Sequence, residues 1–380
     1  MRDGRFRCEV MLTDYFDIII SVLAGMLFAG MMLPVVLRTA LRRHLYDKVD
    51  ARKIHRGNVP RLGGLTFTPG MVMAFLSVIG INLLIDRTAS LDTLNENLPV
   101  AIFGLLSLTI LYGCGVADDI FGVRYRIKFG VQLICAILLI ISGMDVDNLY
   151  GFLGITDLPP WVGYPFTVLL VVLLINAYNL IDGIDGLSTM LCQMAMIVYG
   201  TVFLLSGDVL GCVVAGATVG VTIPFLRYNL FGRCARGTKI FMGDTGSMTL
   251  GLVTAILGLR VLNTDASLAL HDVNPALVAL APVIIPCFDV VRVYTVRIMA
   301  RKSPFLPDRN HIHHRLLDLG LSARRTLACL VFTAAIVAAL NILLSVYVNI
   351  NIILAVDVVA WIAGTTLMVT MIRHRATSLR

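Results

Sequence analysis

The feature that most constrains this chain is a series of apolar segments, each long enough to cross a lipid bilayer. A bilayer core about 30 Å thick takes about 20 apolar residues of helix, so such segments predict transmembrane helices. Only 14% of the residues are charged, whereas soluble domains have about 25%. The segments lie near residues 15–37, 62–85, 99–117, 127–144, 165–181, 187–206, 209–226, 245–262, 277–296, 326–348 and 352–372. The sequence therefore predicts an all-α integral membrane protein, a polytopic bundle of about eleven transmembrane helices forming one domain, residues 1–380.

The basic residues predict how this bundle is oriented. Of the 31 Lys and Arg residues, 25 fall in segments that alternate onto one side of the membrane. These segments are 38–61, 118–130, 182–186, 227–243, 297–325 and 373–380. Since Lys and Arg concentrate in cytoplasmic loops, we expect the N-terminus outside and the C-terminus in the cytoplasm. Arg2, Arg5 and Arg7 oppose this orientation, and we predict that translation starts at Met11. The same distribution accounts for the net charge of +7 without nucleic acid as a partner.

The carboxylates of the predicted cytoplasmic face are all aspartates, because the two glutamates of the chain map to the outside. Asp118 and Asp119 end the third predicted span, and Lys128 follows them. Neighbouring residues on a helix point about 100° apart, so the two carboxylates are expected to have different functions. A carboxylate near the membrane is costly unless it is paired or binds a metal. An ordinary pair of loop charges is the alternative interpretation.

A second polar cluster ends the fifth predicted span. Asn176, Asn179 and Asp182 are spaced at i, i+3 and i+6, which places them near one face of a helix. Gly183 and Gly186 allow a sharp turn after the helix. The C-terminal end of a helix favours a cation, and amide and carboxylate oxygens are ligands that Mg²⁺ accepts. The cluster indicates a magnesium site, with a polar helix cap as the alternative.

The third cluster is the glycine-rich segment Phe241–Ser247, which opens the eighth predicted span. A glycine-rich turn into a helix N-terminus presents free N–H groups that suit a phosphate. Asp244 in this turn is either the helix N-cap or a ligand of a metal that the phosphate also binds.

The fourth cluster is the segment Asp308–Arg315, which contains three histidines within four residues. Zinc sites usually include cysteine and have wider ligand spacing. With Arg309 and Arg315 beside the histidines, a cationic pocket for phosphate oxygens is the favoured interpretation.

All four clusters lie on the predicted cytoplasmic face, and together they indicate phosphoryl transfer involving a lipid. The chain resembles the polyprenyl-phosphate N-acetylhexosamine-1-phosphate transferases (glycosyltransferase family 4), whose motifs occur here in the family's order. The matching pieces are Arg52–His55, Pro60–Gly64, Asp118–Asp119 with Lys128, Asn176–Gly186, Phe241–Ser247 and His311–His314. The resemblance implies one transferase domain whose catalytic face is formed by loops 38–61, 118–130, 179–188, 227–247 and 297–325.

The resemblance also implies roles for individual residues. The metal ligands would be Asn179 and Asp244, for Mg²⁺ or alternatively Mn²⁺. The residues expected to be catalytic are Asp118, Asp119, Lys128 and Asp182. Asp118 or Asp119 would act on the lipid phosphate and Lys128 would contact phosphate, whereas Asp182 is expected near the site without an assigned role. The residues expected to bind substrate are Arg56 at a phosphate, Phe241 on uracil, Asp185 and Asn229 near the nucleoside, and His311, His313 and His314 over the sugar diphosphate.

The implied reaction transfers N-acetylglucosamine 1-phosphate from UDP-GlcNAc to undecaprenyl phosphate, releasing UMP and starting lipid-linked cell-envelope polysaccharide synthesis. The expected location is the bacterial plasma membrane, with the active site on its cytoplasmic face and a homodimer as a further expectation. The segment Val59–Gly64 and the sequence HIHHRL at His311–Leu316 favour this branch over phospho-MurNAc-pentapeptide transfer.

Two other functions use different residues of the same chain. A membrane prenyltransferase would bind magnesium through Asp182 and Asp185 but would not need the Phe241–Ser247 turn. A transporter would use the intramembrane charges Asp289, Arg292 and Asp357. For Asp289 and Arg292 a structural ion pair is the simpler interpretation, whereas Asp357 has no evident partner in the sequence.

Overall fold

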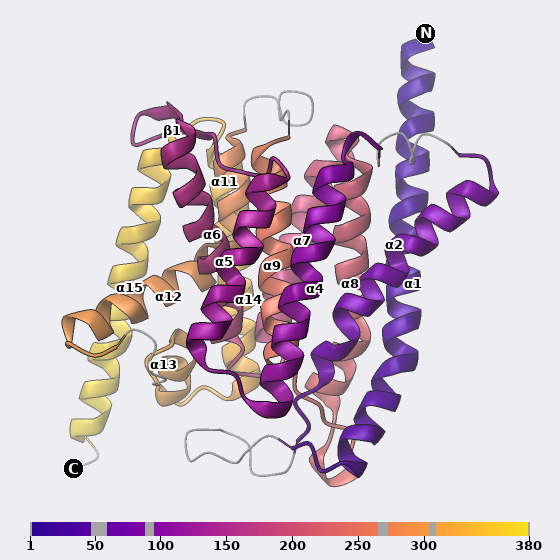
Figure 1. Ribbon diagram of the computed structural model, residues 1–380. Coiled ribbons are helices and arrows are strands. Elements are labelled where there is room, and N and C mark those ends of the chain that lie inside the picture. Colours follow the sequence, from indigo (N-terminus) through magenta and orange to yellow (C-terminus); the bar gives the residue numbers. More distant parts are fainter. Residues whose placement is uncertain (1, 47–58, 88–94, 265–272, 304–308, 379–380) are drawn as a thin grey trace.

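The computed structural model describes residues 2–46, 59–87, 95–264, 273–303 and 309–378. Figure 1 shows a bundle of long helices with a small β-hairpin at one end. The two termini lie at opposite ends of the bundle, as the predicted topology requires. Over the described residues, the architecture confirms the predicted polytopic, all-α membrane protein apart from the hairpin.

The elements of the described residues are mostly helices. They are α1 (Arg2–Arg42), the 3₁₀ turn η1 (Gly63–Thr66), α2 (Phe67–Leu84), α4 (Leu98–Phe121), α5 (Tyr125–Ile141), β1 (Asn148–Phe152), β2 (Ile155–Asp157), α6 (Pro160–Ile181), α7 (Leu187–Ser206), α8 (Val209–Phe231), η2 (Cys234–Arg236), α9 (Gly243–Leu262), α11 (Pro275–Leu280), η3 (Ala281–Val283), α12 (Ile284–Met299), α13 (Ile312–Asp318), α14 (Ala323–Leu344) and α15 (Ile350–Ser378). The strands β1 and β2 pair antiparallel.

The number of spanning helices differs from the prediction at one place. Among the described residues, ten helices are long and apolar enough to cross a membrane. The predicted span 127–144 instead forms α5, a helix of 17 residues. At 1.5 Å per residue such a helix is about 26 Å long, slightly less than a bilayer core.

The predicted span 277–296 is a broken helix. It consists of α11, the 3₁₀ turn η3 and α12. Pro282 lies in the 3₁₀ turn and Pro286 in the first turn of α12, and proline lacks the N–H that a continuous helix would need. After the break α12 runs obliquely towards α15 in Figure 1.

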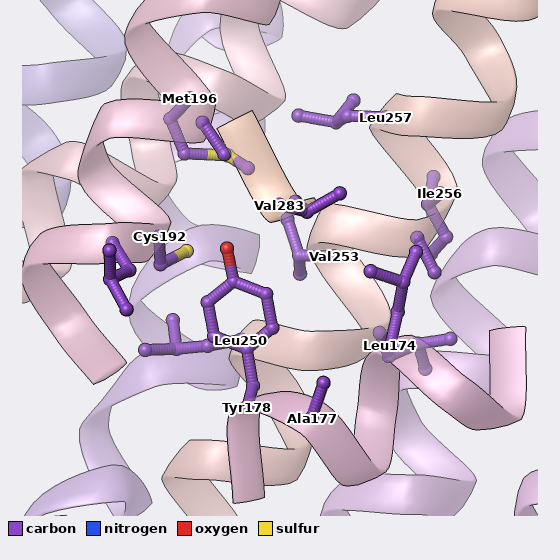
Figure 2. Close-up of a cluster of buried hydrophobic side chains, with 14 of the residues drawn as sticks. Leu174, Ala177, Tyr178, Cys192, Met196, Leu250, Val253, Ile256, Leu257 and Val283 are labelled. Carbon is purple, nitrogen blue, oxygen red and sulfur yellow. The ribbon is translucent and has the colours of Figure 1, made fainter. Parts of the chain in front are cut away.

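Helix α9 forms the centre of the bundle, and nearly all of its residues are buried. Its small residues allow close helix contacts: a Cβ on Gly251 would lie 2.6 Å from the Cα of Ile175 in α6. Figure 2 shows the fully buried Tyr178 of α6 among side chains of α7 and α9, including Met196 and Leu250. This packing fixes the N-terminus of α9, where Asp244 lies.

Candidate active site

The two aspartates at the end of α4 have different partners. Asp119 accepts hydrogen bonds from the backbone N–H of Asp244 at 2.8 Å and of Thr245 at 3.0 Å. The Thr245 hydroxyl donates to the same carboxylate at 2.6 Å. Asp119 therefore caps the N-terminus of α9, where N–H groups lack helical partners. The free N–H groups that the sequence suggested for a phosphate are, at these two positions, bound to Asp119.

Asp118 faces the other way and meets α5. Its carboxylate accepts from Lys128 Nζ at 2.9 Å and from the backbone N–H of Val123 at 2.6 Å. Lys128 Nζ also donates to Asp244 Oδ2 at 2.7 Å. One ammonium thus joins α4, α5 and α9. Arg61 extends the cluster, with its guanidinium 3.5 Å from Asp244 Oδ1.

Glycines let the segment before α2 approach the Asp244 turn. The backbone N–H groups of Gly63 and Gly64 donate to the carbonyls of Phe241 and Met242 at 2.9 and 2.8 Å. A Cβ on Gly64 would lie 2.2 Å from the nitrogen of Gly246, so only glycine fits there. The Pro60–Gly64 motif therefore holds the Phe241–Ser247 motif by backbone contact. Arg56 lies outside the described residues.

Of the second cluster, which consists of Asn176, Asn179 and Asp182, only some side chains face the site. Asn179 Nδ2 donates to Ser247 Oγ at 2.9 Å, so its amide oxygen is the atom that it can offer to a ligand. Asn176 instead donates to Gln132 Oε1 at 2.7 Å and lies one turn deeper in the bundle. Burial, reinforced by the charges of Asp244 and Asp185, raises the pKa of Asp182 to about 8. Asp182 is therefore a neutral carboxyl at pH 7.

Asp185 belongs to a separate, tightly bonded group that includes a buried lysine. Lys239 Nζ lies 2.5 Å from Asp185 Oδ2 and also donates to the carbonyl of Asn229. Asn229 Oδ1 accepts from the Gly186 N–H at 2.7 Å, and its Nδ2 donates to the Ile240 carbonyl at 2.9 Å. Asn229 thus stabilises this subsite by hydrogen-bonding the backbone of Gly186 and Ile240. Sequence reasoning gave Lys239 no individual role, because in the sequence it is one of several basic residues in the segment before α9.

The histidine segment packs directly on the turn after Asp182. A Cβ on Gly183 would lie 2.0 Å from Nε2 of His313. Burial lowers the pKa of His313 to about 3, so its ring is neutral at pH 7. Neither of its ring nitrogens has a hydrogen-bond partner among the described residues. Burial also lowers the pKa of His314. The segment read from sequence as a cationic pocket is therefore largely uncharged at these two rings.

The intramembrane charges that a transporter would use have structural partners. Asp289 pairs with Arg292 at 2.8 Å, as predicted. Asp357 of α15 accepts from Asn341 of α14 at 2.6 Å, a partner that the sequence did not reveal.

The donor chemistry of the site fits a hard cation held only partly by protein. Among the described residues, no group of three or more His, Cys, Asp or Glu side chains is arranged to hold a metal. Asn179 contacts Ser247, which lies three residues after Asp244 in α9, and Asn179 and Asp244 each carry side-chain oxygens. Mg²⁺ typically takes one or two protein carboxylates and completes its shell with water and substrate phosphates. The site suits such an ion, and the described residues offer no zinc cage.

Comparison with known proteins matches residues 101–262 to the family described as Glycosyl transferase family 4. Over 359 residues, the chain is 30% identical to the probable undecaprenyl-phosphate N-acetylglucosaminyl 1-phosphate transferase of Bacillus subtilis (strain 168), covering 91% of this chain and 92% of that protein. It is 29% identical over 324 residues to the undecaprenyl-phosphate alpha-N-acetylglucosaminyl 1-phosphate transferase of Yersinia pestis, covering 83% of this chain and 81% of that protein. The protein of that name from Escherichia coli (strain K12) is 28% identical over 320 residues, with the same coverage.

Proposed function

Because this chain belongs to glycosyl transferase family 4, we propose that it transfers N-acetylglucosamine 1-phosphate from UDP-GlcNAc to undecaprenyl phosphate. In this reaction an oxygen of the lipid phosphate attacks the β-phosphorus of UDP-GlcNAc. The bond from that phosphorus to the bridging oxygen breaks, and UMP leaves with the electron pair. The product is a lipid-linked diphosphate sugar, the first intermediate of a cell-envelope polysaccharide.

One observation carries the proposal: Lys128 joins Asp118 and Asp244 across three helices. Phosphoryl transfer needs positioning and charge neutralisation more than covalent help from the protein. A lysine between two carboxylates is held in place before substrate arrives, and it can then contact phosphate oxygens. Arg61 supplies a second, more exposed positive charge on the other side of Asp244.

We propose different roles for the two aspartates of α4. Asp118, one turn from the end of α4, faces the lysine and is the carboxylate proposed to accept the lipid phosphate proton. That proton has a pKa of about 6, by analogy with phosphoserine, so a carboxylate can accept it. Asp119 is committed to the N-terminus of α9, and we assign it the positioning of Asp244.

Mg²⁺, the ion proposed for this site, would be held by Asp244 and Asn179. Such an ion, or Mn²⁺ in its place, would supply positive charge to the diphosphate and act as a Lewis acid at the phosphate under attack. The neutral Asp182 is proposed to donate a hydrogen bond to a phosphate oxygen, as a carboxyl with a raised pKa can. The ion pair between Asp185 and Lys239 argues against a prenyltransferase, because it occupies one of the two carboxylates that such an enzyme would use to bind magnesium.

The remaining residues are assigned to the donor. Phe241 is proposed to stack on uracil, with Asp185 and the backbone held by Asn229 near the nucleoside. The neutral rings of His313 and His314, together with His311, would cover the sugar diphosphate. We place this single transferase domain in the bacterial plasma membrane, with its active site facing the cytoplasm where nucleotide sugars are made.

The test is UMP release by membranes or detergent-solubilised protein given UDP-GlcNAc, undecaprenyl phosphate and Mg²⁺. UMP is expected only when both substrates are present, and UDP-glucose is the matched donor control. Equal release without the lipid would contradict the proposal. Release with UDP-MurNAc-pentapeptide but not with UDP-GlcNAc would assign the chain to the other branch.

A further inference from the structure

Asp289 of α12 is fully buried and binds the segment that carries the histidines. Its Oδ2 lies 2.8 Å from Nδ1 of His311, and its Oδ1 accepts from the backbone N–H of Ile312 at 2.9 Å. Arg292, one turn further along α12, donates to the same carboxylate at 2.8 Å and to the Asn310 carbonyl at 2.5 Å. Two side chains of α12 therefore hold three consecutive residues, Asn310 to Ile312.

The arrangement determines which nitrogen of His311 is available to a ligand. A carboxylate that faces one imidazole nitrogen keeps the proton on that nitrogen and orients the ring. With the proton on Nδ1, Nε2 is the remaining ring atom that can contact substrate. A buried carboxylate is costly unless its partners are complete, and here those partners come from Arg292 and the histidine segment.

His311 is connected to the Asp182–Gly186 turn through direct side-chain contacts. The rings of His311 and His313 are stacked, with centroids 5.8 Å apart and planes 8° apart. His313 in turn packs on Gly183, which follows Asp182. A shift of His311 would therefore move the ring that lies against the Asp182–Gly186 turn.

We propose that Asp289 is a positioning residue of the transfer reaction, which acts through His311 by fixing the ring nitrogen presented to the donor diphosphate. This inference rests on the proposed function. It gives Asp289 a role that extends beyond its structural ion pair with Arg292.

The test begins with Asp289→Asn. The amide group keeps the shape of the carboxylate, but its N–H₂ facing His311 would favour the other tautomer, with the proton on Nε2. We expect kcat to fall about 10- to 100-fold, the usual range for loss of such an orienting partner, while the KM for undecaprenyl phosphate changes less than about threefold. Asp17→Asn is the matched control, since Asp17 is equally buried and bonded to an asparagine, Asn82, at 3.0 Å; it should keep wild-type kcat.

A double-mutant cycle separates positioning from general stability. If Asp289 acts through His311, Asp289→Asn should cost little further activity in a His311→Ala protein, because coupled residues are not additive. Asp17→Asn should have the same small effect in both backgrounds. A full additional loss from Asp289→Asn in the His311→Ala protein would overturn the inference, as would near-normal activity of Asp289→Asn itself.

His311→Asn covers the case in which Asp289→Asn does not fold. Asparagine can still donate to Asp289 from near the position of Nδ1, but it has no atom at the position of Nε2. We expect a folded protein, by size-exclusion elution and thermal midpoint, with kcat reduced at least about 10-fold. Wild-type kcat in His311→Asn would overturn the inference. Wild-type protein that releases no UMP would instead reject the proposed function itself.

Discussion

Lys128 and Asp244, 116 residues apart in the chain, lie 2.7 Å apart at the point where α5 meets the N-terminus of α9. This pair joins the half of the site that follows α4 to the half that opens α9. Its geometry puts a cation beside the proposed metal ligand. We make a separate prediction for each of the two residues.

Replacing Lys128 should abolish most of the activity. Lys128→Gln leaves Asp118 and Asp244 without their shared cation and removes a charge that can contact phosphate. We expect kcat to fall about 10²- to 10³-fold, the usual effect of losing one such electrostatic group. Lys128→Arg should recover part of the rate. Steady-state UMP release measures this, and Arg126→Gln, a change at an exposed arginine of the same helix, should leave the rate unchanged.

Asp244→Asn should change the response to metal more than the binding of the donor. The apparent Mg²⁺ concentration for half-maximal rate should rise, because an amide oxygen binds the ion less strongly than a carboxylate. The measurement is a Mg²⁺ titration of protein first stripped with EDTA. An unchanged titration curve, at any level of residual activity, would remove Asp244 from the metal site.

Gly183→Ala should disturb the contact between the Asp182–Gly186 turn and the histidine segment. The added methyl would lie 2.0 Å from His313 Nε2, so we expect kcat to fall at least about 10-fold, as small misplacements of catalytic groups do. Gly113→Ala is the matched control, because a Cβ there meets no atom within 4 Å. A Gly183→Ala protein as active as Gly113→Ala would show that this contact does not matter.

Asp182 should make the metal-free protein less stable as the pH rises. Its pKa is raised from 3.8 to about 8 in the folded protein, chiefly by burial. The folded state therefore keeps a proton that the unfolded chain has lost, and the resulting stability, complete below pH 4, disappears as the pH rises through 8. The thermal midpoint with EDTA should fall more between pH 5 and pH 8 in wild type than in Asp182→Asn. Parallel curves would contradict the raised pKa.

Lys239→Met should weaken donor binding more than it slows chemistry. It leaves the carboxylate of Asp185 without its buried cation, and removing one member of such a pair is costly. We expect the KM for UDP-GlcNAc to rise and kcat to change little. The double change Asp185→Asn with Lys239→Met should recover part of the lost stability, measured by thermal midpoint.

The hydrophobic pattern predicted the bundle well, because span length is set by bilayer thickness and is visible in one dimension. It predicted the span at Pro275–Met299 but did not reveal the break at Pro282 and Pro286, since both prolines lie within an otherwise apolar run. The clusters around Asp118, Asp182, Asp244 and the histidines were also visible, as polar residues at the ends of apolar segments.

The pairings between those clusters could not be predicted. Asp119 and Asp244 are 125 residues apart, and nothing in the sequence indicated that one carboxylate would cap the helix bearing the other. The contacts of Lys239 with Asp185 and of Asp289 with His311 were equally hidden, since a buried pairing depends on which helices meet. For Asp357, the partner Asn341 lies on a neighbouring helix and became evident only from the packing of α14 on α15.

The cap that Asp119 places on α9 has a consequence for synthesis of the protein. The aspartate is made early, with α4, whereas the two N–H groups that it accepts from belong to residues made 125 and 126 positions later. At about 5–20 residues per second, the ribosome takes roughly 6–25 seconds to cover that distance. During this interval Asp119 at the end of α4 lacks the two N–H groups that it accepts from. The catalytic centre can therefore assemble only after α9 has been made.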